Sequence, residues 1–163
     1  VLALFALYGR ACMSPNTPDA RLAGFMAKYR PEVGALARAA LATMRKRLPG
    51  AVELVYDNYN ALAIGFGPTE RSSDAIFSIA LSPHWVSLCF LQGAGLSDPH
   101  NVLKGSGKVA RHVVLQDVAT LDKPAVRDLM KLALAQATPL NTAAPRKIVI
   151  KSVSAKQRSR RPG

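Results

Sequence analysis

The chain has 163 residues and a formal net charge of +12, from 22 Lys and Arg against 10 Asp and Glu. Hydrophobic residues make up 49% and charged residues 20%, a composition that can bury a core and excludes a wholly disordered, collagen-like or fibrous chain. Its two cysteines, Cys12 and Cys89, lack the spacing of a zinc site or a disulfide framework, and no apolar run approaches the roughly 18 residues of a membrane-spanning helix. We therefore expect one domain in a reducing compartment, the cytoplasm, without membrane contact.

The first residues of the chain are treated separately. The apolar run 1–7 is too short to span a membrane, and no basic segment precedes it. Met13 and the polar run after it are typical of a natural start. Residues 1–16 are therefore expected to be a disordered or non-native extension, and the alternative is the remainder of a clipped secretion signal.

Two helices are predicted next. Thr17 can cap the first helix, Pro18 suits its first position and Asp19 its positive end. Pro31 opens a longer helix that the pair Pro49-Gly50 ends. Apolar residues spaced by three and four give this second helix one buried face: Val33, Leu36, Ala37, Ala40, Leu41, Met44 and Leu48.

After Gly50 the period of the pattern changes to about two, which predicts strands. Turn residues separate four short runs rich in β-forming residues: 52–56, 61–66, 75–81 and 85–91. The third and fourth runs are largely apolar on both faces, so they are expected to be central strands. The three-residue link at 82–84 makes them an antiparallel hairpin.

The rest of the chain reads as a glycine-rich loop at 93–108, a strand at 111–115, a helix and a last strand. Asp122 is expected to cap the helix, which Thr138-Pro139 ends. The last strand, 147–153, alternates as an edge strand whose lysines face water. Residues 154–163 are basic and are expected to be a disordered tail.

These elements predict an α+β domain over residues 17–153. Its antiparallel meander sheet of four to six strands would be covered by two N-terminal helices and one C-terminal helix.

Four segments carry a resemblance to a known family: the run 48–60 (LPGAVELVYDNYN), the hairpin through Trp85, the loop 103–108 (LKGSGK) and the helix 124–135. Over residues 20–137 the chain resembles bacterial YdhG-like domains. The resemblance implies a small cytoplasmic α+β domain, and some family members are described as frataxin-like iron chaperones. Iron needs clustered carboxylates, but the acids here are scattered, so we expect no metal ligand and no cofactor.

One candidate site is the loop Lys104-Gly105-Ser106-Gly107-Lys108 together with Arg111. Its glycines allow backbone N–H groups to turn inward around an anion, and the three cations supply charge. The spacing is not that of a phosphate-binding Walker A loop. The alternative is a connection whose lysines are only solvated, and the shortness of the motif favours it.

A second candidate is the run 56–60, in which Tyr56, Asp57 and Tyr59 combine aromatic rings with polar groups. These side chains would stack on and hydrogen-bond a small planar ligand. The alternative reading, which the Asp57-Asn58 pair favours, is a tight turn with tyrosines packed at its rim.

No residues are assigned a catalytic role. His84, His100 and His112 are too widely spaced to predict a metal site, and Ser106 is not in a nucleophile elbow. Cys89 lies in an apolar strand, where a thiol is inert.

Charge gives a third candidate. Residues 129–163 contain eight Lys and Arg and no acid, so this segment carries +8 of the net charge. The tail cations would hold nucleic-acid phosphates without reading sequence, with a salt slope of at most about −3.6 on duplex DNA: Lys156, Arg158, Arg160 and Arg161. The alternative is a solvated tail that aids solubility.

The first interpretation is a non-enzymatic module that binds a small molecule or a partner protein through the 56–60 turn and the 104–111 loop. The second is an accessory nucleic-acid binder that acts through the tail. An enzyme remains only if those two segments share a pocket.

Overall fold

The computed structural model describes residues 14–163, so the expected extension 1–16 lies outside the described residues except for 14–16. Within the described residues the chain forms a six-stranded sheet and three α-helices: α1 (Pro18–Ala27), α2 (Pro31–Arg47), β1 (Val52–Asp57), β2 (Leu62–Gly67), β3 (Phe77–Leu81), β4 (Val86–Phe90), β5 (Arg111–Leu115), α3 (Pro124–Gln136) and β6 (Lys147–Val153). The α+β class predicted from the sequence is confirmed. In this part of the chain no helix is both long and apolar enough to cross a membrane.

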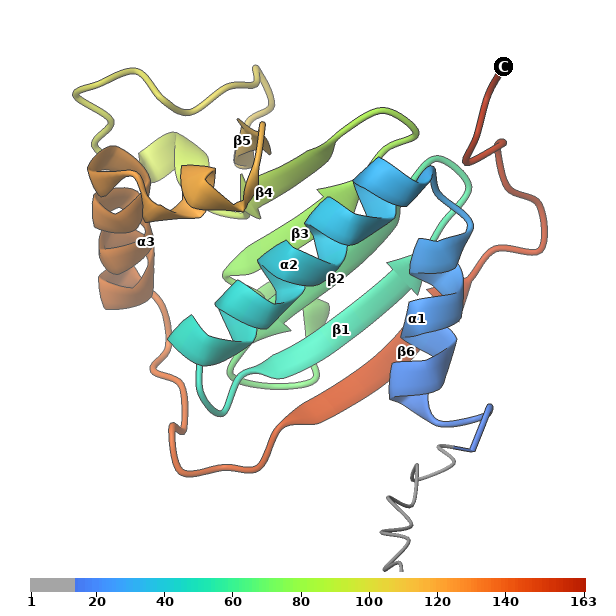
Figure 1. Cartoon of the computed structure of the whole chain (residues 1–163). Helices are drawn as coiled ribbons and strands as arrows, with labels where there is room; N and C mark the ends of the chain where they lie inside the picture. The colour runs from blue at the N-terminus through green and yellow to red at the C-terminus, as the bar shows by residue number, and fades with distance from the viewer. Residues whose placement is uncertain (1–13) are drawn as a thin grey trace, which may run out of the picture.

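The strand order is β5-β4-β3-β2-β1-β6, and the prediction of a purely antiparallel sheet is wrong at its last strand. β1 to β5 form the expected antiparallel meander, but β6 pairs with β1 in parallel. The physical reason is that α3 and the segment after it carry the chain back to the end of the sheet at which β1 begins (Figure 1). A strand that starts there must run parallel to β1.

The three helices cover one face of the sheet, α2 across its middle, α1 beside β1 and β6, and α3 beside β4 and β5 (Figure 1). Between helices and sheet lies a continuous core that includes Tyr29, Met44, Ile64, Ile79 and Leu88, all nearly inaccessible. The alternation along β1 directs Glu53 and Asp57 to this same helix-covered face. Two carboxylates therefore lie among the helices rather than in water.

The predicted helix ends are largely confirmed. The Thr17 hydroxyl accepts a hydrogen bond from the Ala20 N–H at 3.1 Å, which caps α1. Gly50 has φ +78° after the end of α2, and a Cβ there would lie 1.8 Å from the Asn141 carbonyl oxygen. Only glycine fits both the backbone angle and this close approach.

The start of α3 differs from the prediction. Residues Val118–Asp122 form a 3₁₀ helix, and the Asp117 carboxylate, not that of Asp122, caps it by accepting from the Thr120 N–H at 3.1 Å. The side chain of Asp122 instead pairs with Arg47 at the end of α2. α3 itself begins after Lys123, whose side chain makes no capping hydrogen bond, so the prediction that Asp122 caps this helix is wrong.

The C-terminal residues also differ from the prediction of a disordered tail. The Ser154 N–H donates to the Asp57 carbonyl oxygen at 2.8 Å, and the Arg158 N–H donates to the Tyr59 carbonyl oxygen at 2.9 Å. Arg160 is only 5% exposed. Residues 154–163 therefore continue from β6 along the turn between β1 and β2 and pack against it.

Candidate functional site

The turn between β1 and β2 and the C-terminal segment meet at Asp57, so two of the predicted sites are one place in the structure. The Asp57 carboxylate is fully buried. Lys28 Nζ lies 2.9 Å from its Oδ2, and Arg160 Nη2 lies 3.1 Å from its Oδ1. The amide of Gln157 donates to the Asp57 carbonyl oxygen at 3.1 Å. One acid thus holds α1 and the C-terminal segment against the end of the sheet.

The electrostatics of this cluster favour the ionised carboxylate. Burial by itself would raise the pKa of Asp57, but the adjacent Gln157 amide, hydrogen bonds from Lys28 and Arg160 to the carboxylate, and the charge of Lys28 outweigh it, so the pKa lies below its usual range. The group is therefore a structural anion at neutral pH.

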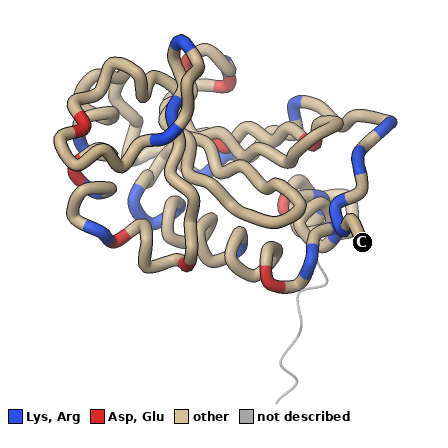
Figure 2. The backbone as a smooth tube through the Cα atoms, turned by 90° about the horizontal axis from the view of Figure 1, so that it is seen from above, with Lys and Arg blue, Asp and Glu red and all other residues tan. Residues whose placement is uncertain are grey.

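Two of the four tail cations are committed to the protein. Besides its pair with Asp57, Arg160 donates to the Tyr59 carbonyl oxygen at 3.2 Å. Arg161 donates to the carbonyl oxygens of Ala27, Lys28 and Tyr29, at 2.9, 3.1 and 3.0 Å, and so caps the C-terminal end of α1. In Figure 2 Lys and Arg positions gather along the chain near the C-terminus. Lys156 and Arg158 remain directed to solvent, Arg158 with one bond to Asn60.

This geometry changes the expected salt dependence of nucleic-acid binding. With Lys156 and Arg158 as the available tail cations, we expect a salt slope on duplex DNA of at most about −1.8. Fluorescence anisotropy across a salt series should show this for the intact chain, and a Lys156→Gln, Arg158→Gln variant should lose the tail's contribution. A slope near −3.6 that falls with Arg160→Gln would contradict the assignment of Arg160 to the fold.

The two tyrosines of the turn differ in their exposure to water. Tyr59 is 46% exposed, whereas Tyr56 is half-buried and its hydroxyl is inaccessible and makes no hydrogen bond within the described residues. Tyr56 and Asp57 occupy opposite faces of β1. The three residues proposed for one planar ligand, Tyr56, Asp57 and Tyr59, therefore do not face a common space.

The 104–111 loop lies at the opposite corner of the sheet. Arg111 pairs with Phe90 at the end of the sheet where β1 starts, and Asp57 lies at the other end, four strands away. Strand spacing and rise place the two segments more than roughly 20 Å apart. The shared pocket that alone kept an enzyme in consideration is therefore not formed.

Within that loop the three cationic side chains do not surround one common site for an anion. Arg111 donates to the carbonyl oxygen of Ala110 at 2.7 Å and to that of Gly107. Its guanidinium therefore binds the backbone of the loop to which it belongs. Lys104 exchanges two backbone bonds with His112 and its ammonium donates to the Asn101 carbonyl at 3.4 Å. Lys108 is exposed. This arrangement favours a structural connection over an anion-binding nest.

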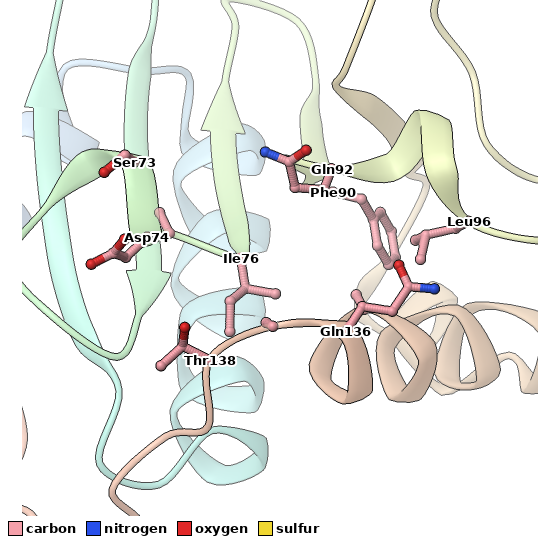
Figure 3. A pocket seen from close by; sticks show the side chains of 11 residues that line it. Ser73, Asp74, Ile76, Phe90, Gln92, Leu96, Gln136 and Thr138 are labelled. Carbon is pink, nitrogen blue, oxygen red and sulfur yellow. The ribbon is translucent and has the colours of Figure 1, made fainter.

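A cavity that sequence reasoning missed lies between the C-terminal end of α3 and the loops around β3 and β4 (Figure 3). It encloses about 320 Å³. Apolar and polar side chains from four separate segments line it: Ser73, Asp74, Ala75, Ile76, Phe90, Gln92, Leu96, Ala133, Gln136, Ala137 and Thr138. No motif could have found it, because none of these segments is unusual by itself.

The lining divides into an apolar floor and a polar rim. Ile76, Phe90 and Leu96 are nearly inaccessible to water and form the floor. Figure 3 shows the Gln136 amide beside Phe90 and Leu96, with Asp74 and Thr138 across the opening. The Asp74 carboxylate accepts from the Thr69 hydroxyl at 2.6 Å, and it is the only ionisable group of the lining. Such a site suits an apolar ligand with a few polar groups.

The described residues offer little support for metal or thiol chemistry. Nowhere in 14–163 do three His, Cys, Asp or Glu side chains lie close enough to hold a metal ion. Burial raises the pKa of the Cys89 thiol, which keeps it in its unreactive form.

Comparison with protein-family models, with curated proteins and with solved structures finds no match for this chain.

Proposed function

We propose that the chain is a non-enzymatic cytoplasmic domain that binds a small neutral or cationic molecule in the cavity at the end of α3. The observation that carries the proposal is the cavity itself, whose volume of about 320 Å³ lies at the lower end of the range of small-molecule sites. The resemblance to YdhG-like domains supports the same class of small α+β module.

The polar rim supports a ligand with hydrogen-bonding groups. Among the described residues, the amides of Gln92 and Gln136 make no hydrogen bond to a protein atom within 3.5 Å. Each amide offers two donors and one acceptor to a bound molecule. Phe90 below them supplies an aromatic surface on which a ring can pack.

The charge of the ligand follows from what the lining contains. Although the chain carries +12, no Lys or Arg among residues 14–163 lines the cavity, and Asp74 contributes a negative charge. The cavity also lies at the C-terminal end of α3, where the helix dipole is negative. Both features disfavour anions and favour neutral or cationic molecules.

Filling the cavity should weaken binding. We expect benzylamine and indole to bind the wild-type chain in ligand-observed NMR and benzoate to bind at least tenfold more weakly. Ala133→Phe, whose ring occupies the cavity, should weaken benzylamine at least tenfold. The matched control is Ala135→Phe, on an exposed position of the same helix, which should leave binding unchanged.

Three results would contradict the proposal. The first is no binding of benzylamine or indole, and the second is benzoate binding as tightly as benzylamine. The third is an equal effect of the two phenylalanine variants, which would place the probes elsewhere.

A further inference from the structure

The outer edge of β5 has one residue whose backbone is free to pair. β5 is the edge strand next to β4. On its outer side the His112 N–H and C=O both bond to Lys104, at 2.9 and 2.8 Å. Alternation along a strand gives the N–H and C=O of Val114 the same outward direction. No backbone bond to the outer side of Val114 is formed within the described residues.

A groove runs beside this free edge. It measures about 610 Å³ and lies between the first half of α2 and the end of β5. Its apolar surface comes mainly from Val33, Leu36, Trp85, Val114 and Val118. Trp85 is 51% exposed and Val114 43% exposed, so two of the large apolar side chains that face water lie at this one place. An exposed sheet edge is where extended peptides add as a further strand, and pockets beside it receive alternate side chains.

The charged residues around the groove indicate which kind of partner it would bind. Glu32 and Asp117 lie in its lining, and no Lys or Arg of the part of the chain that the structure describes does. Glu32 is exposed and makes no ion pair within the described residues, while the Asp117 carboxylate accepts from the Thr120 N–H. In a chain of net charge +12, an acidic rim of this kind complements a basic partner.

The opposite edge of the sheet is built differently. β6 carries Lys147 and Lys151, and its pairing with β1 is irregular between Val55 and Tyr56. Edge lysines and irregular pairing are devices that prevent a further strand from adding. The second half of β5, from His112 to Leu115, has neither lysine nor proline. The two edges thus differ in the property that permits strand addition.

We propose that the β5 groove binds an extended segment of a partner protein. The segment pairs its backbone with Val114, places alternate apolar side chains against Leu36 and Trp85, and carries Lys or Arg beside Glu32. This site is separate from the cavity at the end of α3 and does not rest on the function proposed for it.

The test uses ten-residue random peptides displayed on phage and selected on the full chain, followed by anisotropy measurements with the synthesised winners. The selected peptides are expected to have apolar residues at alternate positions and at least one Lys or Arg. Val114→Lys should weaken them at least tenfold, and Glu32→Lys at least threefold. Val153→Lys is the matched control, because Val153 is 45% exposed on the other edge strand, and it should change affinity less than twofold. Thermal melts confirm that each variant folds.

Any other pattern overturns the proposal. The proposal is wrong if the selection yields no binding peptide. It is also wrong if the selected peptides are acidic or lack apolar residues at alternate positions, or if Val114→Lys and Val153→Lys have equal effects. A dimer that sedimentation detects and that Val114→Lys alone dissociates would mean that a second copy of the chain, and not a partner protein, occupies the groove.

Discussion

Replacing Asp57 with Asn is expected to lower the free energy of unfolding by about 3–5 kcal/mol. The carboxylate is fully buried and balances the charges of Lys28 and Arg160, and Arg160 is itself almost entirely enclosed. Asn keeps the volume of the side chain but removes its charge. The guanidinium of Arg160 then remains buried without a counter-ion. Urea unfolding followed by circular dichroism measures the loss.

The matched control removes a carboxylate that is exposed and makes no ion pair within 14–163, by Asp128→Asn on α3. Its effect should stay within about 0.5 kcal/mol. The pH dependence gives a second check. Because the pKa of Asp57 is lowered on folding, its contribution is present above the unfolded value near pH 4 and is lost as the pH falls through the folded-state pKa. The difference between wild type and Asp57→Asn should therefore shrink below about pH 4. A difference that stays constant there would refute the ion-pair explanation.

Glu53→Gln is expected to cost about 2–3 kcal/mol of unfolding free energy. Glu53 is 1% exposed, and both its oxygens are bound by arginines. Arg45 of α2 lies 2.7 Å from Oε1, and Arg146, which precedes β6, lies 3.2 Å from Oε2. The expected cost is below that for Asp57 because both arginines remain partly exposed and keep water as a partner. Chemical unfolding at pH 7 measures it.

Glu70→Gln is the control for this prediction. Glu70 also pairs with a cation, Lys147, but its side chain is 50% exposed. An exposed pair of this kind contributes little to stability, because water and salt screen it. Equal losses for the two variants would mean that the burial of Glu53 does not set its contribution.

The secondary structure was largely predictable because its signals are local. The spacing of three and four in α2, the cap Thr17 and the stop Pro49-Gly50 each act within a few residues. The alternation in 52–66 and the short link at 82–84 likewise predict neighbouring antiparallel strands. The predicted cap Asp122 is an exception: its carboxylate pairs with Arg47, more than seventy residues earlier, which local sequence does not indicate.

The candidate sites were predicted less well, for a related reason. The sequence predicts the 56–60 turn and the basic tail as separate sites, since nothing in either segment indicates the other. Asp57 and Arg160 are separated by 103 positions, yet their side chains form one ion pair. The sequence predicts Arg160 and Arg161 as phosphate ligands. In the fold, Arg160 pairs with the Asp57 carboxylate, and both arginines donate to backbone carbonyl oxygens.

Local sequence signals suffice for the fold class: an α+β chain with a buried core, helices from residues 18 to 47 and strands from residue 52. Those properties follow from period, capping and turn chemistry, which are short-range. Other features become apparent in the folded chain alone: β6 runs parallel to β1, the tail packs on Asp57, and a cavity and an edge groove form. Each of these depends on which distant segments meet, and period, capping and turn chemistry do not specify that.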